Sequence, residues 1–262
     1  MKKFLASLAA AAMMFVSGTA LAIDIGNDGS IEEEGIMYPP FEQNMNATYR
    51  TATILAHRAL AESIGELHVS SQSTVEDFIL SKDIIKTEVD KILQGSKVTK
   101  RYVADDGSIH VAVRLMAFGS KSSLANVLLE EKTEVEDFPP PKFTNMDSGK
   151  VDNNVQYSGL IINCGGMSLS TAILPAIKSA SGEEIYAYKN ITRQMAVERG
   201  MVSYADSMDS GVQRAGNNPL VINALFPSDE CDVVVSDADA DKILIANQTT
   251  HFLNNCMVVF VR

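Results

Sequence analysis

The stretch ATYRTATILAHRALAESIG, residues 47–65, decides the first part of the fold. Its apolar side chains recur every three to four residues, whereas polar ones such as Arg50 and Glu62 fall mostly elsewhere. The predicted buried face consists of Ala52, Leu55, Ala56, Ala59, Ile64 and Leu67. This spacing is typical of an amphipathic helix, so we expect one long helix over residues 47–67.

The residues after this helix predict a small sheet that packs against it. Residues 109–115 alternate strictly after the turn Asp105-Asp106-Gly107, and apolar side chains recur before it at Val98, Tyr102 and Ala104, which is a strong hairpin pattern. The partial alternation of residues 68–79 predicts a third strand. We therefore expect an α+β layer, a three-stranded antiparallel sheet with the long helix on one face.

Two shorter helices are expected within the same region. Ser81 is placed to cap a helix that carries Ile85 and Val89 on its apolar face and ends at Gly95. Residues 121–129 predict a further short helix. The first domain is thus expected to span residues 45–130.

The second half predicts a mixed α/β domain over residues 155–262. Five short apolar runs are bounded by turn residues and are expected to form strands: 157–163, 184–188, 220–225, 232–236 and 256–261. Residues 193–210 and 237–248 are expected to be helical. The fold class is therefore α+β, with a small antiparallel sheet and a long helix followed by an α/β domain.

Two segments lack this patterning. Residues 23–44 are polar, contain Glu32-Glu33-Glu34 and are expected to form a flexible lead. Residues 131–154 contain several acidic residues and Pro139-Pro140-Pro141, and they are expected to form a proline-rich acidic linker. The proline run could alternatively be recognised by another protein.

The first 22 residues predict where the protein works. Lys2 and Lys3 precede a short apolar run, and Ala20-Leu21-Ala22 forms an A-x-A site, which together are typical of a secretory signal peptide. We expect cleavage between Ala22 and Ile23 and export to the periplasm or the extracellular space. Because residue 23 is isoleucine instead of the cysteine that carries lipid in lipoproteins, no direct lipid anchor is expected.

The net negative charge of the chain argues against two classes of binding partner. The whole chain carries a net charge of −11, and loss of two signal-peptide lysines gives −11 − 2 = −13. Nucleic acid and anionic lipid both require clustered basic residues, so neither is an expected partner. No oligomeric state is predicted.

The three cysteines leave two alternatives open. An oxidising compartment favours one disulfide and one free thiol, and Cys231 with Cys256 is the preferred pair because they precede strands that one βαβ unit would place side by side. Alternatively, all three are small buried apolar residues. Their spacing with the scattered histidines supports no zinc site, and no cofactor is expected.

Each catalytic or binding motif considered is incomplete. The segment Asp237-Ala238-Asp239-Ala240-Asp241 resembles the start of an EF-hand loop, but Lys242 and Gln248 occupy its glycine and glutamate positions. A helix N-terminus capped by Ser236 or Asp237 explains these acids better.

The turn Cys164-Gly165-Gly166 follows a predicted strand, where ligand loops often lie, and it is the candidate ligand turn. It completes neither a nucleophile elbow nor a phosphate loop, so a tight turn is the simpler interpretation. Tyr204 and Arg214 lie on predicted helical sequence and could line a pocket.

The stretch quoted above, together with VSSQSTVED at residues 69–77 and the Asp106-Gly107 hairpin, resembles the Lpp-twenty family of bacterial envelope lipoproteins. It is similar as well to the N-terminal part of flagellar assembly protein T. The resemblance covers residues 47–129 and implies a structural or assembly role in the envelope, with other envelope proteins as partners and no catalytic residues.

Two hypotheses of function follow. The first is an exported envelope protein that binds other proteins without catalysis, in surface or flagellar assembly. The alternative is a periplasmic hydrolase or small-ligand-binding protein that uses the Cys164-Gly165-Gly166 turn.

Overall fold

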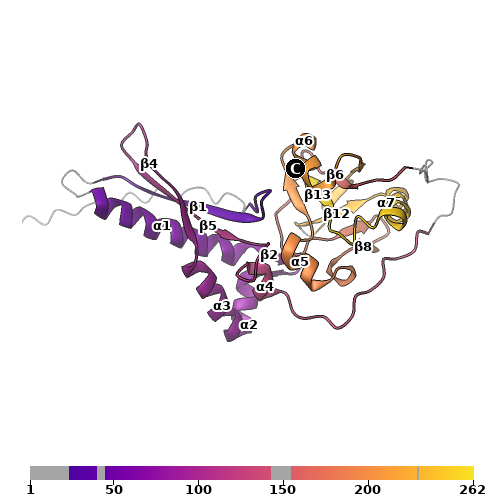
Figure 1. The fold of residues 1–262 in the computed structure, drawn as a ribbon, viewed down its shortest axis with the longest axis horizontal. Helices are drawn as coiled ribbons and strands as arrows, with labels where there is room; N and C mark the ends of the chain where they lie inside the picture. The colour runs from indigo at the N-terminus through magenta and orange to yellow at the C-terminus, as the bar shows by residue number, and fades with distance from the viewer. Residues whose placement is uncertain (1–23, 40–44, 143–154, 229) are drawn as a thin grey trace, which may run out of the picture.

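The long helix expected from the sequence is α1, Met45–Glu66. The computed structural model describes residues 24–39, 45–142, 155–228 and 230–262 (Figure 1). The buried residues of α1 recur every fourth position: Thr48, Ala52, Ala56, Leu60 and Ile64. Because the first three of these are small, a strand can approach the helix closely. The predicted signal peptide and the expected cleavage site between Ala22 and Ile23 lie outside the described residues.

The N-terminal sheet has the order β1-β5-β4, with both pairs antiparallel. Its strands are β1 (Ser30–Met37), β5 (Ile109–Met116) and β4 (Lys97–Val103). The predicted hairpin is confirmed: β4 and β5 pair across a turn in which Gly107 has a φ of +82°. Helix α1 packs on β1 and β5 and thereby covers one face of this sheet.

The expectation of a flexible lead over residues 23–44 is wrong for β1. Ile31 is 1% exposed and Gly35 is buried against α1, so the strand has a buried face that three adjacent glutamates obscure in the sequence. Glu32 on the other face forms ion pairs of 2.9 Å with Lys100 and Arg114. The charge of Glu32 is therefore neutralised by basic side chains of the two other strands of the sheet.

The predicted strand over residues 68–79 is also wrong. Only β2 (His68–Ser70) and β3 (Ser73–Thr74) form, as a separate two-stranded hairpin, and α2 (Val75–Ser81) follows. Thr74 and Asp77 form a capping box, with the Thr74 hydroxyl accepting from the Asp77 amide at 3.3 Å. This local hydrogen bonding favours a helix over an extended strand.

Two further helices complete the N-terminal lobe, the described residues between 24 and 129. Helix α3 (Asp83–Gln94) ends at Gly95 as expected, but Ser81 does not cap it because Lys82 occupies the cap position. Helix α4 (Leu124–Leu128) lies within the predicted range.

The C-terminal lobe, residues 155–262, contains two sheets. Its parallel sheet has the order β10-β6-β13-β9, with strands Pro219–Asn223, Gly159–Asn163, Val258–Val261 and Ser203–Ala205. Its mixed sheet has the order β11-β12-β7-β8, with strands Phe226–Ser228, Asp232–Val235, Ile177–Ser179 and Glu184–Tyr186. All five strands expected here are confirmed.

One of the two helices predicted in this lobe, over residues 193–210, does not form as a single helix. Residues 193–210 form α5 (Arg193–Arg199), then strand β9, then the start of α6 (Met208–Ala215). Gly200 ends α5 with a φ of +71°, which continuous helix does not permit. A short 3₁₀ helix, η1 (Tyr188–Asn190), precedes α5, and α7 (Asp237–Thr250) precedes the last strand. The predicted α+β class is confirmed.

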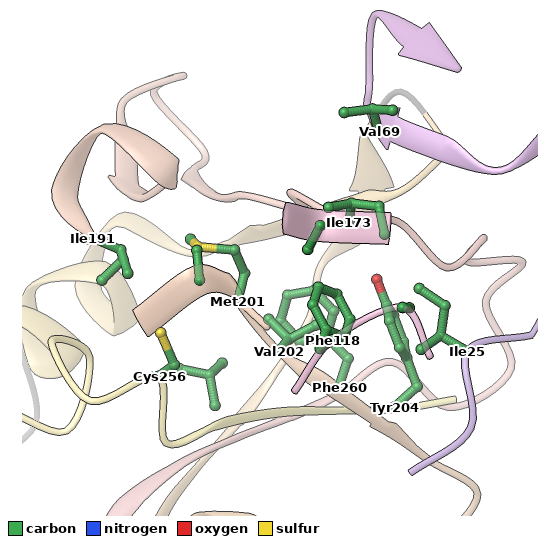
Figure 2. Close-up of a cluster of buried hydrophobic side chains, with 14 of the residues drawn as sticks. Ile25, Val69, Phe118, Ile173, Ile191, Met201, Val202, Tyr204, Cys256 and Phe260 are labelled. Atoms are coloured by element: carbon green, nitrogen blue, oxygen red, sulfur yellow. The ribbon is translucent and has the colours of Figure 1, made fainter. Parts of the chain in front are cut away.

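Phe118 lies where the two lobes meet (Figure 2). Its ring packs against the positions of Gly29 and Gly200, at which an added Cβ would lie 3.4 Å and 2.9 Å from the ring. The amide of Gly119 donates to the Val197 carbonyl at 2.9 Å. One buried cluster contains Phe118 and Val69 from the N-terminal lobe and Phe260 from the C-terminal lobe, so the lobes share apolar contacts.

Residues 130–142, which we call the strap, run along the C-terminal lobe (Figure 1). The Glu136 amide donates to the Lys189 carbonyl at 2.9 Å, and the ring of Phe138 stacks on that of Tyr186 at 6.4 Å. The Lys142 amide donates to Asp241 at 2.7 Å. The described part of the predicted linker is therefore bound to the domain beside it; residues 143–154 lie outside the described residues.

Asn190 is expected to hold the strap in place. Its side chain is 2% exposed and donates to the Asp137 carbonyl at 3.0 Å, while its carbonyl oxygen accepts from Ala187 at 3.2 Å. Because Asn190→Ala leaves buried main-chain groups unpaired, cleavage of the strap by a glutamate-specific protease should accelerate about tenfold. Gln194→Ala, at an exposed position on α5, should leave the cleavage rate unchanged. Equal rates for both variants would show that the strap is held by other contacts.

Candidate functional site

The Cys164-Gly165-Gly166 turn lies at the carboxyl edge of the parallel sheet, as expected. The Cys164 amide donates to the Val261 carbonyl of the neighbouring strand at 2.7 Å. The Gly165 amide donates to the Asn163 side chain at 3.1 Å, and Gly166 has a φ of +79°. These contacts satisfy the main chain of a tight turn and leave the two glycines exposed.

The thiol of Cys164 is turned into the core. The residue is 1% exposed, and its sulfur lies 3.7 Å from the Ile162 carbonyl oxygen. Burial raises the pKa of the thiol to about 12. A nucleophilic cysteine needs a lowered pKa and access to substrate, and Cys164 has neither.

Cys231 and Cys256 are also buried, and no disulfide joins them. The predicted pairing assumed that the strands following these two cysteines are neighbours, and this assumption is wrong. Cys231 precedes β12 in the mixed sheet, whereas Cys256 precedes β13 in the parallel sheet, so the two following strands are not neighbours. In the sequence, β12 precedes and β13 follows helix α7, and this order does not reveal that the two strands belong to different sheets.

We expect all three thiols to be unreactive in the folded protein. Burial excludes reagent from each of them and raises the pKa of Cys164 and Cys256. At pH 8 a thiol-specific reagent should therefore label none of them, whereas Ser122→Cys, at an exposed position, should be labelled readily. In urea without reductant three groups should react. A count of one would show that a disulfide forms after all.

The acidic segment 237–241 begins a helix, as the cap interpretation predicted. The Ser236 hydroxyl accepts from the Asp239 amide at 3.1 Å. Asp237 accepts from the Ser181 amide at 2.9 Å, and this hydrogen bond lowers the pKa of the Asp237 carboxyl. Within the described residues, no group of three or more histidine, cysteine, aspartate or glutamate side chains is placed to hold a metal ion.

Tyr204 and Arg214 have structural partners. Tyr204 lies on β9 instead of a helix, is 3% exposed, and accepts from the Ala172 amide at 3.0 Å. The guanidinium of Arg214 donates to the carbonyls of Arg199 and Gly200, at 2.7 and 2.6 Å, and so satisfies the end of α5. Burial lowers the pKa of Arg214.

Arg214 also lines a crevice between the lobes. The crevice has a volume of about 100 Å³, and its walls come from residues 25–29, Phe118, Gly119 and residues near α5 and β9. Sites for small molecules usually have about 300–1,000 Å³. The crevice therefore has room for little more than a few water molecules.

One end of the N-terminal sheet carries exposed apolar and aromatic side chains that the sequence patterns did not predict. Ile36, Tyr38, Tyr102 and Val103 are exposed by 43%, 52%, 44% and 47%, and we call them the sheet tip. Ile36 and Tyr102 flank His110 on the face opposite α1, because His110 is the register partner of both. The tip belongs to the end of the sheet remote from Phe118.

The aromatic side chains of the tip are held in place. The ring of Tyr102 stacks on His110 with centroids 4.6 Å apart, and the Tyr38 hydroxyl donates to Asp106 at 3.0 Å. Ordered tyrosines contribute large contact areas at low entropic cost, which is why they are enriched in protein interfaces. Alternation alone could not reveal this surface, because packing decides which faces of β1 and β4 another element covers.

The fold and these surfaces define a two-lobed α+β protein with its cysteines buried and an aromatic tip exposed. Residues 159–262, from β6 to the last strand, match the family described as Treponema pallidum Tp0624, second domain. That description names no activity. No curated protein matches the chain. Among the described residues, no helix has the length and apolar character needed to cross a membrane.

Proposed function

We propose that this chain is an exported bacterial envelope protein with a non-catalytic role in assembly, and that it binds another envelope protein through the sheet tip. The observation that carries the proposal is the exposure of Ile36, Tyr38, Tyr102 and Val103 at the end of a sheet that α1 covers on one face. Ile36 and Tyr102 lie on the face opposite α1, and Val103 lies on the other face at the same end of the sheet. Exposed apolar and aromatic side chains gathered at one sheet end favour a docking surface over a solvated one.

The proposal includes export and the envelope resemblance. Its support is the signal-like segment 1–22 and the similarity of residues 47–129 to the Lpp-twenty family. Mass spectrometry of the protein from an envelope fraction should find Ile23 at the N-terminus. Intact Met1 in the cytosol would contradict export.

The alternative, a periplasmic hydrolase or small-ligand-binding protein, depended on the Cys164-Gly165-Gly166 turn. Because the Cys164 thiol is buried and its pKa is raised to about 12, no observation favours this alternative over a docking role.

Complementation of a deletion strain separates the two functions. Tyr102→Glu changes an exposed side chain of the tip and should abolish complementation while leaving the purified protein folded. Ile84→Glu, 73% exposed at the start of α3, is the matched control and should complement fully. Cys164→Ala should also complement. Loss of function in a folded Cys164→Ala variant, with Tyr102→Glu active, would overturn the proposal in favour of an enzyme.

A further inference from the structure

The outer edge of the parallel sheet is uncharged over an unusual length. Residues 215–228 read AGNNPLVINALFPS and contain no acidic or basic side chain, in a chain whose charged residues make up 21%. This segment includes β10, an edge strand, and β11, the edge strand of the mixed sheet. Val221, Leu225 and Phe226 along it are 50%, 49% and 51% exposed. Exposed edge strands are usually protected by charge, and this one is not.

The register of β10 shows which main-chain groups face outward. The Asn218 carbonyl accepts from Ser158, and the Ala224 amide donates to the Asn163 carbonyl, so the even-numbered residues of β10 bond to β6. Successive residues of a strand direct their main-chain groups to opposite sides. The amide and carbonyl of Val221 and Asn223 therefore point away from the sheet, on the side where β10 has no neighbouring strand among the described residues.

We propose that this edge pairs with the same edge of a second copy of the chain. The two β10 strands would run antiparallel about a twofold axis at Val221, joining two four-stranded sheets into one of eight strands. Val221 would exchange two hydrogen bonds with its copy. Each Asn223 amide would donate to the Pro219 carbonyl of the other copy. This inference concerns a surface other than the sheet tip and does not rest on the proposed function.

The position of Pro219 suits this register. Proline has no amide hydrogen, so it is tolerated where a strand edge needs only an acceptor. Pro219 of one copy supplies a carbonyl acceptor opposite Asn223 of the other. Among the outward main-chain groups of residues 219–223, only the Asn223 carbonyl, at the exposed strand end, would have no partner in this register. Two copies of this edge can therefore form hydrogen bonds to each other while β10 keeps its hydrogen bonds to β6.

Charge favours a second copy at this edge over the edges at β1 and β4 of the N-terminal sheet. Pairing of two β1 edges would oppose Glu32-Glu33-Glu34 to the same acids, and two β4 edges would oppose Lys97, Lys100 and Arg101 to the same bases. Like charges directly opposite each other destabilise strand pairing. In a molecule of net charge −11, β10 and its continuation offer an edge at which two copies meet without that cost.

The sheet order leaves room for the second copy. Ser203 of β9, at the opposite edge from β10, lines the crevice between the lobes, and Arg262 after β13 pairs with Asp24 at 2.6 Å. The N-terminal lobe therefore contacts the far side of the sheet. Helix α6 packs mainly on β6, β13 and β9, and Val221 of β10 is half-exposed.

Sedimentation of the purified mature protein over a range of concentrations tests the proposal. The wild-type protein should show a monomer–dimer equilibrium and no larger species, since a twofold contact closes on itself. Val221→Lys should weaken dimerisation at least about tenfold, because it places two ammonium groups opposite each other at the axis. The matched control Ile84→Lys, on α3, should dimerise like the wild type. Circular dichroism should show both variants folded, since both positions are exposed.

A charge-swap pair then tests the twofold axis itself. Val221→Lys and Val221→Glu should each be monomeric alone and should form a one-to-one dimer when mixed. A wild-type protein that stays monomeric, dimerisation unaffected by Val221→Lys, a mixture that fails to associate, or open-ended oligomers would each overturn the proposal.

Discussion

Replacing Gly35 by alanine is expected to separate β1 from α1 and to lower the free energy of unfolding by more than about 3 kcal/mol, beyond the usual cost of overpacking. An added Cβ at Gly35 would lie 2.1 Å from the Ala52 carbonyl oxygen and 2.3 Å from the Ala56 nitrogen. Both neighbours are main-chain atoms of α1, so neither can move without displacing the helix. Urea unfolding measured by circular dichroism provides the test.

Gly65 provides the matched control. It lies within α1, and a Cβ added there has no atom within 4 Å. Gly65→Ala should stabilise the protein by about 0.5–1 kcal/mol, since alanine restricts the unfolded chain and favours helix. Similar stabilities for the two alanine variants would mean that β1 does not pack against α1 as described.

Replacing Phe118 by alanine is expected to cost about 3–5 kcal/mol, the range for deleting a buried aromatic ring. Phe118 is 5% exposed and occupies the space beside Gly29 and Gly200, where no side chain can replace it. The cavity would open between the lobes (Figure 2), so the variant should also unfold in two steps instead of one.

The control for this variant is Leu80→Ala. Leu80 is 79% exposed at the end of α2, and its truncation should change stability by less than about 0.5 kcal/mol. A Phe118→Ala protein as stable as Leu80→Ala would show that the lobes do not depend on this contact.

Local patterns predicted most of the individual elements correctly. Helix α1, the β4–β5 hairpin, the cap of α7 and the five apolar strands of the C-terminal lobe each depend on signals carried by adjacent residues. The errors occurred where a distant partner decides the outcome. Strand β1 contains three adjacent glutamates, and it is a strand because Lys100 and Arg114 neutralise Glu32 and because α1 covers Gly35.

The candidate sites likewise divide into features that adjacent residues predict and features that distant contacts decide. The turn at Cys164 was placed correctly at the edge of the sheet, but its thiol faces the core, and side-chain direction there depends on how β6 packs. The sheet tip was missed because α1 packs on β1 and β5, which leaves Val103 of β4 exposed on the same face, and because Tyr102 lies on the opposite face.

By itself, then, the sequence determined the α+β class, most helices and strands, and the signal-like segment, because periodicity, caps and turns act over a few residues. Only the tertiary structure decided the third strand of the first sheet, the separation of Cys231 from Cys256 and the uncharged open edge at β10. These features depend on which strands become neighbours. Strand neighbours are selected by packing and main-chain pairing between residues far apart in the chain, which no local pattern records.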